Sequence, residues 1–590
     1  MSFRHVRIFC LSTLLVLTVC ACEDPLTPEQ EEIIEGLNER EIPPWFDEAK
    51  FGIFIHWGPY AIPAFAPIEG TINDALVNHF DDFTLHTPYV EWYWNALQFE
   101  DSATYAYHAA NYGSDYPYDN FGSIFRQEVE DWDPQAWGDL FQAAGARYVV
   151  LVTKHHDGFL MWPSAHTNPN KTDWYSERDI VGELAQAVRS QGMRFGVYYS
   201  GGLDWAWNGR SARNIVEMGA SIPIDDAYQE YAEAHYRDLI ERYEPSVLWN
   251  DIAYPFNRGL WELQRDYYEA VPEGVVNDRF AVMGPITRWL QVPFVRDLFH
   301  SLLKFFSELT GDLSVLQGTP PPHVDFRTLE YQAIDGIKEE KVEVTRGMGL
   351  GFGYNRFETD DDFLSEEELI HSFVDIVSRN GNLLLNVGPK VNGDIPAIQA
   401  TRLGQLGDWL AVNGEAIYGT RPWVRAEGET GLGHGLRFTQ SENGRFAIVL
   451  SDLTPGSVHY NNELIRRHCA TYDRWLFDFA DIEAHDPDGT YFWDQAMYDN
   501  LDYAGGNWAS EWIAANPGSE LEQLTTGVGV NDYDGLDYCA HSDSPSQATL
   551  NCVLKGRAAW WLFATLTGWN ENIIFEDGFE SANLDNWSGP

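Results

Sequence analysis

The chain has 590 residues, of which 44% are hydrophobic, so it is long enough for two or three domains with a large core. Its 90 acidic and 38 basic residues give a formal net charge of −52, which argues against nucleic acid or an anionic membrane surface as a partner. The 23 tryptophans are numerous, and most of them must be core residues even if some line a ligand site.

Residues 1–22, "MSFRHVRIFCLSTLLVLTVCAC", predict an export signal, because arginines precede an apolar stretch that ends in small or thiol residues. The final "VCAC" resembles a bacterial lipobox that would place a lipid on Cys22, and ordinary signal cleavage is the alternative. We therefore expect an exported protein that is periplasmic, extracellular or lipid-anchored at the envelope. After signal removal no segment is long and apolar enough to span a bilayer.

Three cysteines follow the signal, and their odd number allows one disulfide in an oxidising compartment. Cys539 and Cys552 are the closer pair, and Cys469 is the third. No zinc-type spacing is present, and the chain lacks a glycine-rich phosphate loop. We therefore expect neither a metal nor a cofactor, and the sequence leaves the oligomeric state open.

Strand-like and helical patterns alternate between residues 46 and 419, after a linker at 23–45. The strand-like runs are "FGIFIHWG" (51–58), "YVVLVTK" (148–154), "RFGVYYS" (194–200), "SVLWND" (246–251), "GVVNDR" (274–279), "GLGFGYN" (349–355) and "NLLLNVGP" (382–389). Helical stretches such as "DIVGELAQAVRSQG" separate them. This spacing implies parallel strands with right-handed crossovers. Roughly eight such units predict an α/β fold of the (β/α)8-like barrel type.

The pattern changes after residue 419. Residues 420–456 contain two strand-like runs around a turn at Asn443-Gly444, which predicts the start of a β-sandwich-like domain. Residues 457–570 form an irregular C-terminal region, and residues 571–590 form a terminal tail.

Polar and aromatic side chains follow or end the strand-like runs. They are His56, His155, His156, Tyr199, Trp249, Asp251 and Arg279, with Glu91, Trp92 and Glu330 in intervening segments. Because the carboxyl ends of barrel strands share one face, we expect these side chains to converge. Two carboxylates among histidine, tyrosine and arginine donors suit hydrolysis of a glycosidic bond, in which one carboxylate attacks and the other protonates the leaving oxygen.

A resemblance makes this interpretation specific. The ordered segments "WFDEAKFGIFIHWGPYAIPAF", "VEWY", "YVVLVTKHHDGFLMWPS", "VLWND", "VNDR", "DFRTLEY", "TRGMGLGFGYNR" and "SRNGNLLLNVGPKVNGDIP" resemble glycoside hydrolase family 29, the α-L-fucosidases, across residues 44–453. The resemblance implies a barrel followed by a β-sandwich. It also implies a retaining, exo-acting enzyme that removes terminal α-L-fucose from glycans.

The resemblance also assigns roles to residues. Asp251 of "LWND" matches the nucleophile, and Glu330 of "TLEY" matches the acid/base. The positions that match the fucose pocket are His56, Glu91, Trp92, His155, His156, Tyr199, Trp249 and Arg279. Glu339, Glu340 and Glu343 are interpreted as solvated helix charges.

Other functions remain as alternatives. One is an inactive glycan-binding protein on the same barrel, and another is an exo-glycosidase for a galactose-configured sugar. A metal site at His155 and His156 is a weaker interpretation, since adjacent residues on a strand point to opposite sides.

Two insertions and the tail depart from the family pattern. Residues 66–88 widen one loop, and residues 281–322 add a long segment. Within the latter, residues 294–309 have an amphipathic helical pattern, with Val295, Leu298, Phe299, Leu302, Phe306 and Leu309 on one face. We expect this helix to pack on the barrel rim as a lid or wall of the pocket, and membrane contact is the weaker alternative because its polar face is not basic. The tail resembles part of a secreted SGNH-like bacterial module without its nucleophile block, and His541 is interpreted as a turn residue.

Overall fold

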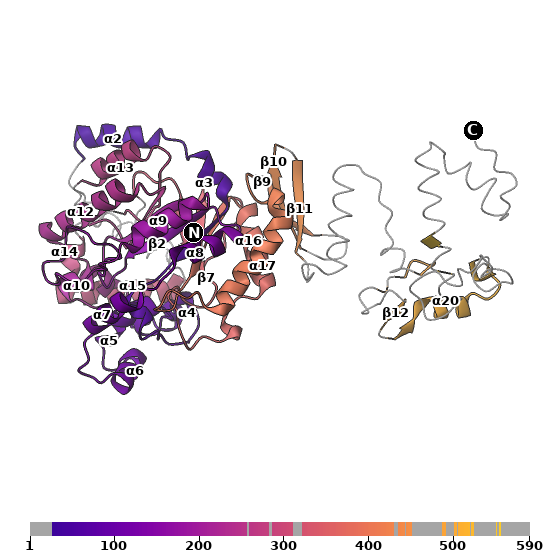
Figure 1. Cartoon of the computed structure of the whole chain (residues 1–590), viewed down its shortest axis with the longest axis horizontal. Coiled ribbons are helices and arrows are strands. Elements are labelled where there is room, and N and C mark those ends of the chain that lie inside the picture. The colour runs from indigo at the N-terminus through magenta and orange to yellow at the C-terminus, as the bar shows by residue number, and fades with distance from the viewer. Residues whose placement is uncertain are drawn as a thin grey trace, which may run out of the picture. The chain divides into compact units, whose positions relative to one another are not determined.

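The structure is a computed structural model that describes residues 26–255, 259–281, 286–310, 321–429, 435–442 and 444–450, and short stretches between 486 and 555. The chain divides into two compact units, Met1–Ser451 and Asp452–Pro590 (Figure 1). The predicted export signal, the Cys539–Cys552 pair, His541 and the terminal tail lie outside the described residues.

An eight-stranded sheet of parallel strands forms the centre of the first unit. Its strands are β1 (Phe51–Ile55), β2 (Tyr148–Lys154), β3 (Arg194–Ser200), β4 (Val247–Asp251), β5 (Val275–Val276), β6 (Arg327–Glu330), β7 (Val342–Gly347) and β8 (Gly381–Val387). They lie in the order β5-β4-β3-β2-β1-β8-β7-β6. The two edge strands meet through a parallel bridge between Asn277 and Phe326, so the sheet curls back on itself. The predicted (β/α)8-like barrel is confirmed.

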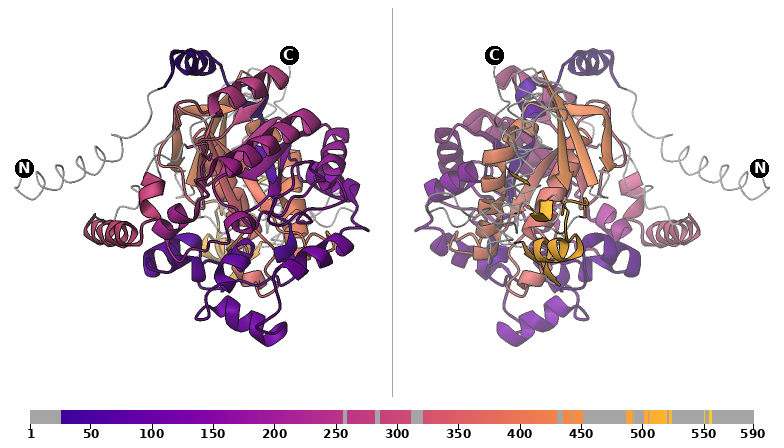
Figure 2. Two further views of the ribbon diagram at one scale, coloured as in Figure 1. Left: turned by 90° about the vertical axis from the view of Figure 1, so that its left-hand side faces the viewer. Right: turned by 90° about the vertical axis from the view of Figure 1, so that its right-hand side faces the viewer.

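Helices surround this sheet (Figure 2). They are α2 (Pro28–Asn38), α3 (Pro44–Ala49), α4 (Ile72–Asn78), α5 (Tyr93–Leu97), α6 (Ala103–Asn111), α7 (Asp119–Glu128), α8 (Pro134–Ala143), α9 (Ile180–Ser190), α10 (Trp205–Asn208), α11 (Ile215–Ser221), α12 (Asp226–Tyr243), α13 (Leu260–Ala270), α14 (Ile286–Leu290), α15 (Pro293–Thr310), α16 (Glu366–Ser378) and α17 (Ala397–Asn413). Short 3-10 turns include η2 (Phe83–Leu85) and η3 (Val90–Trp92). Within the described part of the chain, no helix is long and apolar enough to cross a membrane.

Local sequence explains where these elements begin. Asp133 and Asp179 accept backbone hydrogen bonds as N-caps of α8 and α9, and Ser365 forms a capping box with Glu368 at α16. The strands are buried on both faces, as parallel strands between helices and a barrel interior must be. Phe54 and Leu384 belong to the core that fills the barrel.

The strand prediction was wrong in one region. Residues 349–355, predicted as a strand, form bends, and the sheet instead takes β6 and β7 from the segment before them. The run "KVEVTRG" was overlooked because its charged residues suggest a solvated surface. In the structure Glu343 on β7 is completely buried, so its interpretation as a solvated helix charge was also wrong.

A small antiparallel sheet follows the barrel in the same unit. It consists of β9 (Arg421–Glu429), β10 (Gly435–Ser441) and β11 (Gly444–Leu450), in the order β11-β10-β9. In the second unit the described elements are β12 (Asp502–Tyr503), β13 (Gly506–Asn507) and α20 (Trp508–Ala515), with Trp508 and Trp512 in a small apolar cluster.

Candidate active site

The barrel topology brings the two predicted catalytic carboxylates to one end of the sheet. Asp251 is the last residue of β4, and Glu330 is the last residue of β6. Arg279 follows β5, the strand that lies between them where the barrel closes. The three side chains therefore come from three successive strands of the closed barrel.

Arg279 joins the two carboxylates directly. Its Nη1 donates to Oδ1 of Asp251 at 2.8 Å, and its Nη2 donates to Oε2 of Glu330 at 2.9 Å. Its Nε donates to Thr328 at 3.0 Å, which fixes the plane of the guanidinium. A single planar cation thus spans both acids, in the forked geometry that arginine favours.

Asp251 is held in its ionised form. Burial alone would raise its pKa, but the Arg279 charge and the hydrogen bonds from Tyr198 and Arg279 outweigh burial and lower the pKa below its usual value. The Tyr198 hydroxyl donates to Oδ2 of Asp251 at 2.7 Å, and the backbone N–H of Ile252 donates to Oδ1 at 2.9 Å. The side chain is therefore a positioned, charged carboxylate.

Glu330 has a more open environment than Asp251. Its side chain is 24% exposed, against 11% for Asp251. The hydroxyl of Tyr89 donates to Oε1 of Glu330 at 2.6 Å. One carboxylate is thus enclosed, while the other is more accessible to solvent.

Three histidines form a buried group next to Asp251. His56 hydrogen-bonds Asn386 at 2.7 Å, and His156 hydrogen-bonds Ser200 at 2.7 Å and lies 3.9 Å from Asp251. The ring of His155 lies between the other two, with centroids 5.7 Å from His56 and 4.0 Å from His156. Burial lowers the pKa of His56 to about 4 and that of His156 to about 3. Neutral imidazoles can both donate to and accept from sugar hydroxyls.

Glu91 and Trp92 reach the same region from the turn η3. Burial raises the pKa of Glu91 to about 8, and its Oε2 accepts the backbone N–H of Gly353 at 3.0 Å. The ring of Trp92 meets His156 edge-on, with centroids 5.3 Å apart. A carboxyl group that keeps its proton at neutral pH can donate to a hydroxyl oxygen.

Trp249 forms the floor beneath the charged network. Its ring stacks on Tyr198 with centroids 5.4 Å apart, and the Arg279 guanidinium lies 4.9 Å above it. Its indole N–H donates to Glu343 at 2.9 Å, and the Tyr148 hydroxyl donates to the other oxygen of Glu343. Glu343 therefore anchors the indole that supports Arg279 and Tyr198.

Replacing Glu343 by glutamine should change how stability depends on pH. Burial raises the pKa of folded Glu343 to about 7 from an ordinary value of 4.5. Its ionisation therefore weakens the folded state as the pH rises from 4.5 through 7, by a few kcal/mol at most. We expect Glu343→Gln, relative to the unchanged chain, to gain stability between pH 5 and pH 8 in thermal unfolding. Exposed Glu100→Gln is the control, and an equal pH trend in the two variants would contradict the assignment.

Tyr199 is the predicted site residue that the structure does not bring to this group. Its hydroxyl hydrogen-bonds His235 of α12 at 2.9 Å, on the helix side of β3. Adjacent residues of a strand face opposite sides, so the neighbouring Tyr198 points into the barrel and reaches Asp251. Sequence reasoning missed Tyr198 and also Tyr89, although the pair "YY" in β3 indicates that one of the two faces inward.

Replacing Tyr198 or Tyr199 by phenylalanine compares the contributions of the two hydroxyl groups to turnover. Tyr198→Phe removes a hydrogen bond to a charged carboxylate, which is worth about 1.5–3 kcal/mol. We expect turnover to fall by about 10- to 100-fold, whereas Tyr199→Phe should change turnover by less than about threefold. Steady-state kinetics measures the turnover of both variants. A larger loss with Tyr199→Phe would reverse their roles.

The two insertions pack against each other. In α15, Phe299 and Leu303 pack against α11 and Phe80, so the predicted helix docks on the barrel rim. His300 hydrogen-bonds Asp81 at 3.0 Å, which joins the 281–322 insertion to the 66–88 insertion. Leu298, predicted on the buried face, is 51% exposed, because the contact runs through Phe299, which was predicted, and Leu303, which was not.

The 66–88 insertion in turn reaches the catalytic strand ends. Asn73 of α4 donates to the carbonyl of Tyr331 at 3.3 Å, directly after Glu330. Ile72 packs in the cluster that contains Trp92 and Tyr331. The 66–88 insertion therefore borders Glu330, the more open of the two carboxylates.

A barrel with two carboxylates at the carboxyl ends of its strands is the arrangement that a glycoside hydrolase needs. The alpha-L-fucosidase family model matches residues 18–415, and the chain belongs to this family. Tissue alpha-L-fucosidase of Rattus norvegicus is 32% identical over 398 residues, which are 66% of this chain and 72% of the rat protein. Plasma alpha-L-fucosidase of Homo sapiens is 31% identical over 410 residues, 67% of this chain and 74% of the human protein.

Solved structures agree with this assignment. The α-fucosidase of Thermotoga maritima in complex with fucose has a TM-score of 0.59 and 41% sequence identity, and the match covers 71% of this chain and 86% of that chain. A further alpha-L-fucosidase structure has a TM-score of 0.62 at the same identity and coverage. The chain is thus an α-L-fucosidase-type glycoside hydrolase.

Proposed function

We propose that the chain is a retaining, exo-acting α-L-fucosidase that works by double displacement. The observation that carries the proposal is the bridge of Arg279 between Asp251 and Glu330. Double displacement needs two carboxyl groups about 5–5.5 Å apart, whereas inversion needs about 6.5–9.5 Å to admit a water. One guanidinium in contact with both acids favours the compact arrangement.

In this mechanism Asp251 attacks the anomeric carbon of α-L-fucose. Its lowered pKa keeps it ionised, and Tyr198 and Arg279 orient its oxygens. Glu330 protonates the leaving oxygen and then takes a proton from the water that cleaves the fucosyl-enzyme. Its greater exposure suits contact with the leaving group and with water.

The histidines, Glu91 and Trp92 would bind the sugar. Neutral His56, His155 and His156 exchange hydrogen bonds with hydroxyl groups, and protonated Glu91 donates one. The ring of Trp92 offers a flat apolar face to the C–H face of the sugar, whereas Trp249, whose ring is covered by Tyr198 and Arg279, supports the site from below. Tyr199 would act indirectly, through the packing of β3 on α12.

Hydrolysis of paired aryl glycosides tests this function. The chain should cleave aryl α-L-fucoside far faster than aryl α-L-galactoside, which carries a hydroxymethyl group where fucose has a methyl. Absence of fucoside cleavage by the folded chain would favour a glycan-binding protein. Faster cleavage of the galactoside would favour the related exo-glycosidase.

The packing of α15 should affect which leaving groups the enzyme accepts. Leu303 is buried against α11, so Leu303→Ala loosens α15, whereas Leu298→Ala alters an exposed position of the same helix. We expect Leu303→Ala to change the ratio of kcat/KM between an aryl fucoside and a fucosylated oligosaccharide by about threefold or more, about 0.7 kcal/mol. Leu298→Ala should leave it unchanged. If the two variants gave the same ratio of kcat/KM, the packing of α15 would not determine substrate preference.

A further inference from the structure

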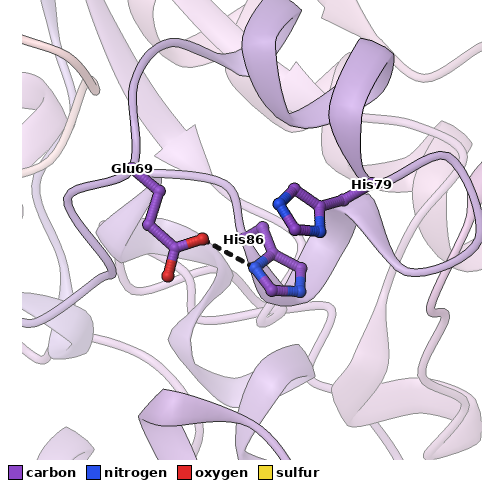
Figure 3. Close-up of side chains that lie close together, drawn as sticks. All are labelled: Glu69, His79 and His86. Carbon is purple, nitrogen blue, oxygen red and sulfur yellow. Dashed lines mark hydrogen bonds and ion pairs between the residues drawn. The ribbon is translucent and has the colours of Figure 1, made fainter.

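The 66–88 insertion holds a second cluster of ligand-type side chains, separate from the paired carboxylates. Glu69, His79 and His86 each offer one ligand atom, and these atoms all lie within 4.8 Å of one another (Figure 3). Nδ1 of His86 is 2.7 Å from Oε2 of Glu69. Glu69 is exposed and both histidines are partly exposed, so an ion can reach the cluster from solvent.

The local fold of the insertion brings the three residues together. Thr71 and Asp74 form a capping box that starts α4, and His79 is the residue at which this helix ends. His86 occupies the same position after the turn η2. The two histidines therefore stand at defined ends of two short elements.

A carboxylate also lies behind one of the candidate ligands. Nε2 of His86, the nitrogen that faces away from Glu69, is 3.7 Å from Oδ2 of Asp82. A histidine that binds a metal through one nitrogen usually donates its other N–H to a carboxylate or carbonyl. Asp82 could accept this hydrogen bond from Nε2 of His86.

The orientation of the two imidazole rings determines whether they can share one ion. The rings of His79 and His86 are stacked, with centroids 3.6 Å apart and planes 14° apart. In-plane lone pairs of nearly parallel rings do not meet at one point, so one imidazole must turn to share an ion. The partly exposed His79 ring can do so by a change of rotamer.

We propose that Glu69, His79 and His86 bind one divalent transition ion of the zinc class, with water completing its coordination. Two imidazoles and one carboxylate suit zinc, cobalt, nickel or copper, whereas calcium and magnesium prefer all-oxygen sites. The ion would stabilise the loop that contains these residues. Three residues after His86, this loop reaches Tyr89, whose hydroxyl donates a hydrogen bond to Glu330.

Cobalt titration of the full chain without a histidine tag tests this proposal. The visible absorption of bound Co²⁺ should saturate at one equivalent, and Zn²⁺ but not Mg²⁺ should displace it. His79→Ala and His86→Ala should each weaken binding at least tenfold. His371→Ala is the matched control, because His371 lies 3.7 Å from Glu367 on α16 and belongs to no three-ligand group among the described residues. This variant should bind cobalt like the unchanged chain.

The variants also locate the ion. Unfolding midpoints measured with a chelator show that each variant is folded before metal is added. Absence of cobalt absorption in the unchanged chain would overturn the proposal. Equal affinity in the unchanged chain and both loop variants would overturn it as well, because the ion would then sit elsewhere.

Discussion

Asp251→Ala is expected to lower the turnover of an aryl α-L-fucoside by about a thousandfold or more. The variant removes the enclosed, ionised carboxylate from the floor of the pocket. It should still fold, because Arg279 keeps its ion pair with Glu330 and Trp249 keeps its bond to Glu343. Steady-state kinetics, with circular dichroism as the folding control, provides the measurement.

Azide should restore part of the activity of Asp251→Ala, and the anomer of its product should show from which face of the sugar the nucleophile attacks. The anion fits the space that the carboxylate leaves and attacks from the same face, so the product is β-L-fucosyl azide. Near-native turnover of a folded variant, or an α-azide product, would remove Asp251 from the role of nucleophile.

Glu330→Ala is expected to show the second large effect, and this effect should depend on the leaving group. General acid–base assistance contributes about 10²–10⁴-fold. Substrates with poor leaving groups should lose this full amount, while an activated aryl fucoside, which needs little protonation, should lose much less in the first step. Kinetics on a series of aryl fucosides and one fucosylated oligosaccharide measures the difference.

Azide distinguishes Glu330 from Asp251. In Glu330→Ala the fucosyl-enzyme still forms, and azide attacks it from the opposite face to give α-L-fucosyl azide. The two variants should thus give opposite anomers. A uniform loss across all leaving groups, without any azide product, would indicate that Glu330 supports the pocket but transfers no proton.

The barrel and most of the site could be predicted from the sequence, because many site residues stand directly at or after the ends of apolar strand-like runs. Asp251 and Arg279 follow apolar runs, and parallel topology then brings them together. Glu330 required the family resemblance, since its strand is short and only partly buried. Its contact with Arg279 crosses the closure of the barrel, which no local pattern reveals.

The choice between Tyr198 and Tyr199 could not be made by pattern. Both faces of a barrel strand are buried, so hydrophobic alternation does not indicate which residue points inward. The register also shifts between β2 and β3, between Val152 and Lys154, so counting from the neighbouring strand is unreliable. The same double burial explains Glu343, whose charge suggested solvent while its partners lie inside the barrel.

The contact between the two insertions was equally hidden. The amphipathic pattern of α15 predicted a docked helix, but the partner of its apolar face, Phe80, lies more than two hundred residues earlier in the other insertion. Likewise, Glu69, His79 and His86 show no regular metal-ligand spacing in the sequence. Their proximity arises from the turn between α4 and η2.

The stereochemistry of the first product tests the central claim most directly. Proton NMR during the first minutes of hydrolysis of an aryl α-L-fucoside distinguishes the two anomers of released fucose before they interconvert. Double displacement at Asp251 and Glu330 predicts that α-L-fucose appears first and β-L-fucose accumulates only by mutarotation. Initial release of β-L-fucose would contradict the retaining mechanism.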